Sequence, residues 1–306
     1  MRHRWLAVAL IGFTGLAAAA SGEDIARLGT INYIEGTAYL QGKPIKHSDV
    51  GSAVLHKGQM LTTGDGRAEI LLTPGVFLRV DDNSAIRMVS PRLLQTQVEL
   101  MQGKAAVEVD EIHKENDLEV LVGGVRTQML QTGYYEFDAT NPKAMVFKGK
   151  AAVDLGHDKY NVVKGNHELA LSDNLKAKPA EFNPTASQDD LYHWSNLRSQ
   201  YLAEANNELA QEYADTPGFE PGWFWDPYGY DFTYIGMGPF WSPFGFGFFP
   251  PWYGGFYGGF YGGYGRYYGR GGYYGRGGYG GIGRGGYGGM HAGIGGGMHG
   301  GGGARR

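Results

Sequence analysis

The stretch of the sequence most suggestive of chemistry is an acidic run between two apolar segments. It holds four acids and one histidine, at Asp110, Glu111, His113, Glu115 and Asp117. Oxygen donors at this density could hold a hard cation. The spacing is not that of an EF-hand, which has a glycine at its centre and a bidentate glutamate at its end. A solvated hairpin loop is therefore the favoured interpretation, and we expect no metal site here.

Other chemistry-bearing residue types are absent or scattered. The chain has no cysteine, which excludes disulfides, thiolate nucleophiles and cysteine metal sites. No Gly-x-Ser-x-Gly elbow or phosphate-binding loop occurs. The histidines show no paired ligand spacing, at His47, His56, His157 and His167 and, in a glycine tract, at His291 and His299. We predict a protein that is not an enzyme, with no catalytic residue, cofactor or metal. An envelope hydrolase stays open, because acids distant in sequence can meet in space.

The elements that would position any site are short strands joined by tight turns, seen best between Gly58 and Val89. Thr62–Gly66 is predicted as a turn, since its Gly-Asp-Gly steps accept positive φ. Arg67–Thr73 is then a strand in which Ala68, Ile70 and Leu72 alternate with Glu69 and Leu71. Pro74-Gly75 suits a type II turn into a return strand. Asp81-Asp82-Asn83 turns the chain again into Ser84–Val89.

The same stretch resembles the FecR domain. The matching residues are turn glycines and strand positions that include Gly58, Thr63, Gly64, Arg67, Ala68, Gly75 and Ser84. They specify a fold more than a chemistry. The resemblance implies a bacterial envelope protein. FecR proteins pass a ferric-siderophore signal from an outer-membrane receptor to a cytoplasmic sigma factor.

Alternating apolar runs with turns between them continue over residues 29–171, and the predicted breaks include Glu35-Gly36 and Gly123-Gly124. About a dozen strands at roughly 8–12-residue spacing predict an all-β antiparallel sandwich or jelly roll. The loosely regular hairpins leave a β-solenoid as the alternative. No helical pattern intervenes, which disfavours parallel βαβ topology.

Residues 1–20 read as a signal peptide. A basic start (Met1–Arg4) precedes an apolar run, and small residues precede a cleavage point between Ala20 and Ser21. The run is shorter than the roughly 20 residues that a membrane span needs. We therefore expect export to the periplasm or outer envelope of a bacterium and no transmembrane span in the mature chain.

A single amphipathic helix is predicted over residues 185–214. Ser187 or Thr185 can cap its start. Its apolar stripe comprises Leu191, Trp194, Tyr201, Leu202, Ala205, Leu209 and Tyr213. Packing against the β domain is favoured over a partner-binding role.

An aromatic Gly/Pro segment follows over residues 219–264, and a Gly/Tyr/Arg-rich tail over 265–306. Exposed aromatics mark an adhesive surface, with Trp223, Trp225, Trp241 and Trp252 as candidate interaction residues. The segment is expected to dock on the β domain or to adsorb to envelope protein, polymer or lipid. The tail is predicted to be disordered because glycine loses most backbone entropy on ordering. It carries six arginines and no acid, and the chain has a net charge of −4, so the remainder is acidic.

These features favour a non-catalytic cell-envelope protein that acts by binding or assembly, with self-association open. Nucleic-acid binding by the Arg/Gly tail is disfavoured, because an exported protein meets little RNA. The alternative is a FecR-type signalling or regulatory module linked to a sigma-factor and siderophore response. The sequence leaves the partner, the strand order and the oligomeric state open.

Overall fold

The computed structural model describes residues 26–156, 160–171 and 177–253. The predicted signal peptide with its Ala20–Ser21 cleavage point, residues 254–264 of the aromatic segment and the Gly/Tyr/Arg tail lie outside these residues. The first strands are β1 (Ile31–Leu40), β2 (Lys43–Pro44), β3 (Met60–Leu71), β4 (Val76–Val80), β5 (Ala85–Arg92), β6 (Gln95–Gln102) and β7 (Lys104–Val109), with a 3-10 turn at His47–Asp49. Then come β8 (Asp117–Val122), β9 (Val125–Met129), β10 (Gly133–Asp138), β11 (Lys143–Lys148), β12 (Lys150–Asp154), β13 (Asn161–Lys164), β14 (His167–Ala170) and β15 (Ala180–Glu181).

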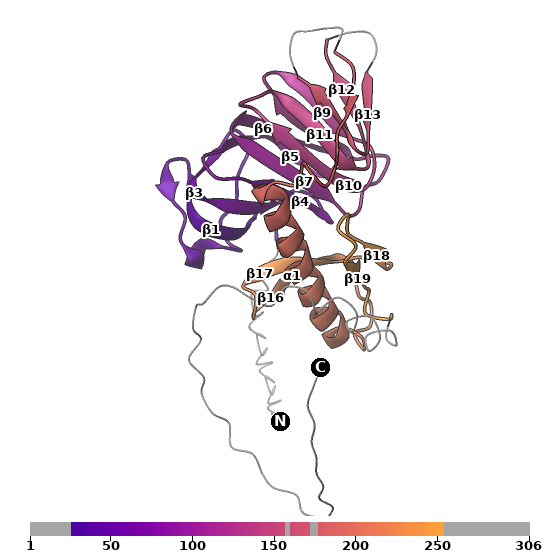
Figure 1. The fold of residues 1–306 in the computed structure, drawn as a ribbon. Coiled ribbons are helices and arrows are strands. Elements are labelled where there is room, and N and C mark those ends of the chain that lie inside the picture. Colours follow the sequence, from indigo (N-terminus) through magenta and orange to yellow (C-terminus); the bar gives the residue numbers. More distant parts are fainter. Residues whose placement is uncertain (1–25, 157–159, 172–176, 254–306) are drawn as a thin grey trace, which may run out of the picture. The chain divides into compact units, whose positions relative to one another are not determined.

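These fifteen strands form one sheet (Figure 1), whose main path runs β13-β12-β9-β8-β6-β5-β3-β4-β7-β10-β11-β14-β15. Every pairing is antiparallel except that of β6 with β8. The two halves of the path share a single core, in which Val98 and Val120 lie in the same buried cluster as Val107 and Val146. The predicted mostly β fold is thus confirmed, as one continuous sheet that encloses its own core. The antiparallel pairing does not fit the β-solenoid alternative.

The centre of the sheet is β3, and here the predicted turn at Thr62–Gly66 is wrong. The strand continues through these residues, pairing first with β5 and then with β4, while β1 follows it along its length. Gly66 faces Gly36 across a bulge, where a Cβ on Gly66 would lie 2.1 Å from the carbonyl oxygen of Glu35. The glycines therefore permit a close approach of two strands at a bulge and do not reverse the chain. For the same reason β1 is not interrupted at Gly36.

Two turns form where they were predicted. At Pro74-Gly75 the Val76 amide donates to the Thr73 carbonyl oxygen at 2.8 Å, and Gly75 has a φ of +74°. Gly123 and Gly124 join β8 to β9 with φ values of +57° and +83°. Such positive φ values suit glycine, so local chemistry alone determines these turns.

The alternation predicted for Arg67–Thr73 describes only one face of the strand. Glu69 and Leu71 point away from the main core, yet both are fully buried, as are Phe77 and Arg79 of β4. A second layer covers this outer face. It consists of α1 (Asp190–Glu212) and the hairpin of β16 (Gly222–Asp226) with β17 (Asp231–Ile235), and a short pair, β18 (Phe240–Trp241) with β19 (Gly247–Phe248), adjoins it (Figure 1).

The helix has the expected position but a different cap. Asp189, rather than Ser187 or Thr185, accepts from the Tyr192 amide at 3.0 Å, and its other oxygen accepts from Lys104 Nζ at 2.7 Å. Asp189 is preferred because it both caps the helix and pairs with a strand lysine. No helix among the described residues is long and apolar enough to cross a membrane.

The helical stripe was correct in part. Leu191, Trp194, Leu202, Ala205 and Leu209 are buried, but Tyr201 is 50% exposed. The buried face also carries polar side chains that the apolar pattern omitted, at Ser195, Arg198, Ser199 and Asn206. They are buried because they meet polar groups of the sheet and the hairpins.

The described part of the aromatic segment docks on the β domain. Phe232, Tyr234 and Phe248 share a buried cluster with Leu71 and Phe77 of the sheet, and with Leu202 and Ala203 of α1. Hydrogen bonds fix the docking, since Thr233 Oγ1 donates to the Leu202 carbonyl at 2.6 Å and Asn206 Nδ2 donates to the Tyr234 carbonyl at 2.9 Å. Of the two expected behaviours, docking is therefore the one that this structure displays.

The turn at Gly75 generates a test. Gly75→Ala should lower the free energy of unfolding by about 1–3 kcal/mol, because φ is positive and the new Cβ would lie 2.9 Å from Glu111 Cβ. Urea denaturation followed by circular dichroism measures this change. Gly222→Ala is the control, since no atom lies within 4 Å of its added Cβ. Equal stability of the two variants would contradict this account of the turn.

Candidate functional site

The most unusual feature of the structure is a network of charged residues buried on the outer face of β3, β4 and β7. Arg79, on β4, is fully buried between two acids. Its Nε donates to Glu69 Oε2 on β3 at 2.9 Å, and its Nη1 pairs with Glu108 on β7. The strand register places Glu69 directly opposite Arg79, so sheet pairing alone assembles this half of the network.

The helix and the hairpin supply the other half. Arg198 of α1 donates through Nη2 to Glu69 Oε1 at 2.9 Å and to Asp231 Oδ2 of β17 at 2.6 Å. Its guanidinium also stacks on Tyr33 of β1, 4.1 Å from the ring centroid. Ser199 Oγ donates to Glu108 Oε1 at 2.6 Å. Glu69 is thus held by two arginines that come from different layers.

Asn32 of β1 completes the connection. Its Nδ2 donates to Glu69 Oε1 at 3.0 Å and to the Phe232 carbonyl at 2.9 Å, while its Oδ1 accepts from the Phe232 amide at 2.7 Å. The buried Asn32 side chain therefore links the backbone of the β16–β17 hairpin to Glu69 by hydrogen bonds. We call the set Asn32, Glu69, Arg79, Glu108, Arg198, Ser199 and Asp231 the buried charge network.

The electrostatics of the network follow from burial and opposite charge. Burial raises the pKa of Glu69, but Arg198 and Arg79 outweigh it and bring that pKa to about 2. Burial raises the pKa of Asp231 despite its bond to Arg198. Nearby Asp110 is buried without a hydrogen-bond partner that meets the usual geometry, and burial, together with the Glu108 carboxylate, raises its pKa well above the ordinary range. Glu69 therefore stays ionised, while the pKa shift of Asp110 favours its protonated form.

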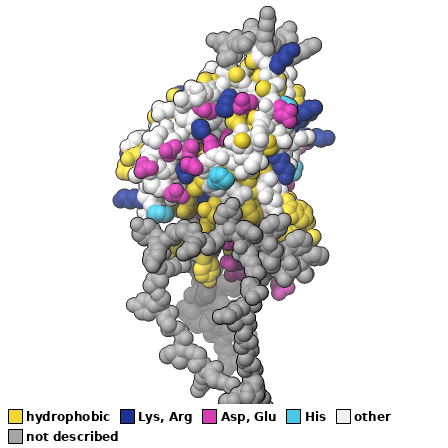
Figure 2. All heavy atoms as spheres, viewed as in Figure 1, with side chains coloured by type: hydrophobic (Ala, Val, Ile, Leu, Met, Phe, Trp, Pro, Cys, Tyr) yellow, Lys and Arg dark blue, Asp and Glu magenta, His cyan; other side chains and the backbone are white. Residues whose placement is uncertain are grey.

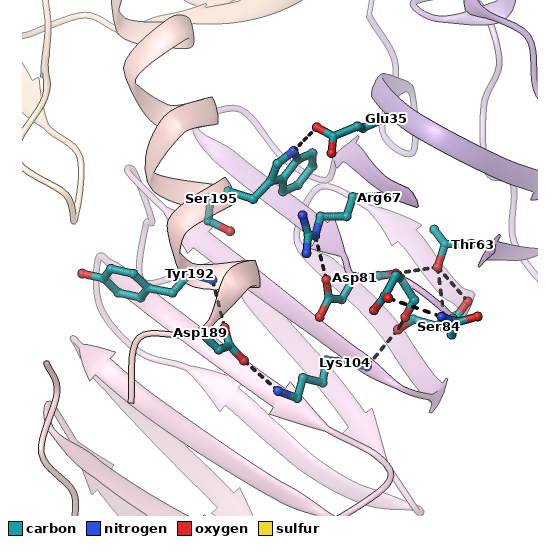
Figure 3. Close-up of polar contacts among 12 residues, drawn as sticks. Glu35, Thr63, Arg67, Asp81, Ser84, Lys104, Asp189, Tyr192 and Ser195 are labelled. Carbon is teal, nitrogen blue, oxygen red and sulfur yellow. Dashed lines mark hydrogen bonds and ion pairs between the residues drawn. The ribbon is translucent and has the colours of Figure 1, made fainter. Parts of the chain in front are cut away.

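The residues of the predicted family motif form a second, smaller cluster around the Asp81–Ser84 turn (Figure 3). Thr63 Oγ1 donates to the Asp81 carbonyl at 2.5 Å and accepts from the Ser84 amide at 3.0 Å. Ser84 Oγ accepts from the Lys104 amide at 2.9 Å, and Arg67 Nε pairs with Asp81 Oδ1 at 2.8 Å. These side chains hold the turn and the start of β7 together.

The remaining motif positions also have backbone or packing roles. Gly58 has a φ of +79° in a turn, and Gly64 lies in the bulge, where a Cβ would be 2.6 Å from Thr37 Oγ1. Ala68 is fully buried in the core, and Gly75 forms the turn described above. Each of these positions therefore has a backbone or packing role in the structure.

Among the described residues, no group of three or more acid or histidine side chains is placed to hold a metal ion, in the acidic run or elsewhere. The acidic run is not simply a solvated loop either. Asp110 is 4% exposed, and Glu111 Oε2 accepts from the Tyr234 hydroxyl at 2.6 Å. The solvated interpretation is wrong for Asp110, which is buried, and Glu111 is in contact with the docked hairpin through Tyr234. His113 and Glu115 are exposed.

The four candidate tryptophans divide into two groups. Trp223 packs edge-on against Phe77 at a 5.1 Å centroid distance, and Trp225 packs edge-on against Phe232 at 5.0 Å. These two belong to the docking layer. Trp241 and Trp252 are 59% and 54% exposed and remain available at the surface.

A pocket of about 240 Å³ lies beside the start of α1, between Lys104, Lys143, Asp138 and Asp189. Its buried wall includes Glu136, whose Oε1 has no hydrogen-bond partner. Burial, with Asp189 nearby, raises the pKa of Glu136 to about 8 despite the opposing influence of Lys104. This shift favours the protonated form of Glu136 at neutral pH.

Sequence reasoning missed the buried charge network. A usable signal existed, because Glu69, Arg79 and Glu108 each interrupt an apolar strand that has no polar face, in the runs AEILL, VFLRV and AVEV. A charge within such a strand predicts a buried partner. The identity of the partner on α1 needed the fold.

Residues 59–152, which run from β3 into β12, match the family model described as FecR protein. No curated protein matches the chain. It is similar to a putative anti-sigma factor from Parabacteroides distasonis ATCC 8503, with 12% identity over 56% of this chain and 81% of that chain. The TM-score of that similarity is 0.34.

The network predicts a large effect of a small change. Glu69→Gln should lower the free energy of unfolding by about 3–5 kcal/mol, because Arg79 and Arg198 lose the carboxylate between them. The control is Glu99→Gln, which removes the partner of the part-exposed Arg87 and should cost no more than about 1 kcal/mol. Chemical denaturation compares the two. A loss for Glu69→Gln as small as that of the control would contradict the role given to the network.

Glu136 predicts a pH dependence. The folded protein holds a proton on this residue between about pH 4.5 and 8, whereas the unfolded chain releases it. The free energy of unfolding should therefore fall as pH rises through this window, by up to about 1.4 kcal/mol per pH unit. Glu136→Gln should reduce that slope and make the protein more stable than wild type at pH 8. Exposed Glu181→Gln is the control. If thermal unfolding showed the same dependence of stability on pH for wild type and for Glu136→Gln, the assignment would be refuted.

Proposed function

We propose that this chain is a non-catalytic regulatory module of the FecR type, which acts by binding a partner protein in a sigma-factor-linked response. The observation that carries the proposal is the FecR match over residues 59–152, which extends from the central strand β3 into β12. The match favours a regulatory role over the general envelope-binding role that the composition suggested.

Two further features support the proposal. The charged side chains of the buried network bond to one another, which is the use expected of a structural scaffold rather than of a reactive site. FecR proteins are envelope-associated and typically non-catalytic, and the predicted signal peptide at residues 1–20 agrees with that location.

A second candidate function is binding to an envelope surface through the exposed tryptophans. The observation that favours it is the exposure of Trp241 and Trp252, together with Met237 at 58%. Figure 2 shows hydrophobic side chains gathered at the edge of the molecule where β18 and β19 lie in Figure 1. Tryptophan is suited to surfaces that are partly apolar and partly wet.

One experiment separates the two candidates. The gene is deleted in the native cell and restored as wild type, as Trp241→Ala/Trp252→Ala, or as the control Tyr160→Ala, whose residue is 62% exposed and directly precedes β13. RNA sequencing and envelope fractionation are then measured for each strain. We expect deletion to change the transcripts of one sigma-factor regulon, and both variants to restore them.

Unchanged transcripts on deletion would contradict the regulatory proposal. If the tryptophan variant were also lost from envelope fractions while Tyr160→Ala was retained, the second candidate would replace it.

A further inference from the structure

A second pocket of about 400 Å³ lies between α1 and the β16–β17 hairpin, beside β1. Its walls combine aromatic rings with acids: Tyr33 and Tyr201, with Glu204, Glu208, Asp226 and Asp231. Gly229 of the hairpin turn lines it as well, and the flanking Tyr228 and Tyr230 are 81% and 67% exposed. The site is thus an acidic pocket with tyrosines in its wall and beside its hairpin edge.

The charge of this pocket is unbalanced on the helix side. Glu204 and Glu208 are four residues apart on α1, where like charges repel, and the last turn of the helix contains no basic residue. Arg198 lines the pocket, but Glu69 and Asp231 already take its charge. A cationic ligand would relieve these repulsions.

A second observation points to a ligand that also accepts hydrogen bonds. Arg198 is 4% exposed, and its Nε is a buried donor with no hydrogen-bond partner among the described residues. A buried donor without a partner costs free energy, and Arg198 is one of the residues that line the pocket. The pocket therefore favours a ligand that carries both positive charge and carbonyl oxygens, and a basic peptide has both.

The tyrosines distinguish arginine from lysine. A guanidinium group is planar, stacks on aromatic rings and pairs with carboxylates in a fork, whereas an ammonium group behaves as a compact point charge. Arg198 already stacks on Tyr33 in this way, and half-exposed Tyr201 offers a second ring. On α1, Glu204 and Glu208 lie about one and about two helical turns after Tyr201.

We propose that this pocket binds an arginine-containing segment of a partner protein, with Glu204 and Glu208 pairing with its guanidinium groups. The biological role of this binding rests on the proposed regulatory function, whereas the binding itself does not. Binding is measured with purified protein, so its failure is distinguishable from a failure of the transcript experiment.

The test uses the full chain and a fluorescent nine-residue peptide of alternating glycine and arginine. Anisotropy titrations compare wild type with Glu204→Gln/Glu208→Gln, which should fold well because the change removes a repulsion within the helix. The charge-matched control is Glu115→Gln/Glu181→Gln, at two exposed acids outside the pocket. A glycine-lysine peptide of the same length tests the choice of cation.

We expect saturable binding, weakened at least tenfold in Glu204→Gln/Glu208→Gln and unchanged in the control, with the lysine peptide weaker than the arginine peptide. Equal weakening in both double variants would show attraction to net charge alone and would overturn the proposal. So would undiminished binding by Glu204→Gln/Glu208→Gln, or no binding of the arginine peptide by wild type.

Discussion

The structure depends on one buried carboxylate. Glu69 lies at the centre of the sheet with no exposure, and two arginines from different layers bond to its two oxygens. A buried charge is tolerable only when it is paired and hydrogen-bonded, so each member of the network needs the others in place. Burying ion pairs adds little net stability, but losing one partner is severe. The network therefore acts chiefly by selecting one arrangement of sheet, helix and hairpin.

This constraint explains why α1 and the hairpins, which follow the large sheet in the sequence, fold with it. Arg198 of α1 forms ion pairs with Glu69 of β3 and with Asp231 of the hairpin. Asn32 of β1 donates a hydrogen bond to the hairpin backbone. Phe232 and Tyr234 then cover Leu71 and Phe77, which would otherwise form an apolar face open to water. The acidic pocket arises at the junction of these same elements, so its shape depends on the network beneath it.

The sequence predicted those features that local chemistry determines. The turns at Pro74-Gly75 and Gly123-Gly124, the mostly β fold and the helix position follow from glycine, proline and apolar periodicity. Thr62–Gly66 was mispredicted because a glycine pair serves a turn and a bulge equally well, and only the partner strand β1 decides between them. The predicted buried stripe of α1 included Tyr201, which is exposed, and omitted Arg198, which is buried. The error arose because an apolar stripe cannot show that the facing sheet is charged. Glu69 and Arg79 could have been noticed in their apolar strands, but their partners on α1 and β17 are too distant in sequence to infer.

The measurement that tests the central claim most directly is native-state hydrogen exchange, resolved by residue, of the full chain in low concentrations of denaturant. If the buried charge network joins the three elements into one cooperative body, the slowest amides of β3, α1 and β17 should converge on the same opening free energy. The account predicts that convergence. Amides of α1 and β17 that open together at a much lower free energy than those of β3 would show a helix and hairpin held loosely on an independent sheet, and would contradict it.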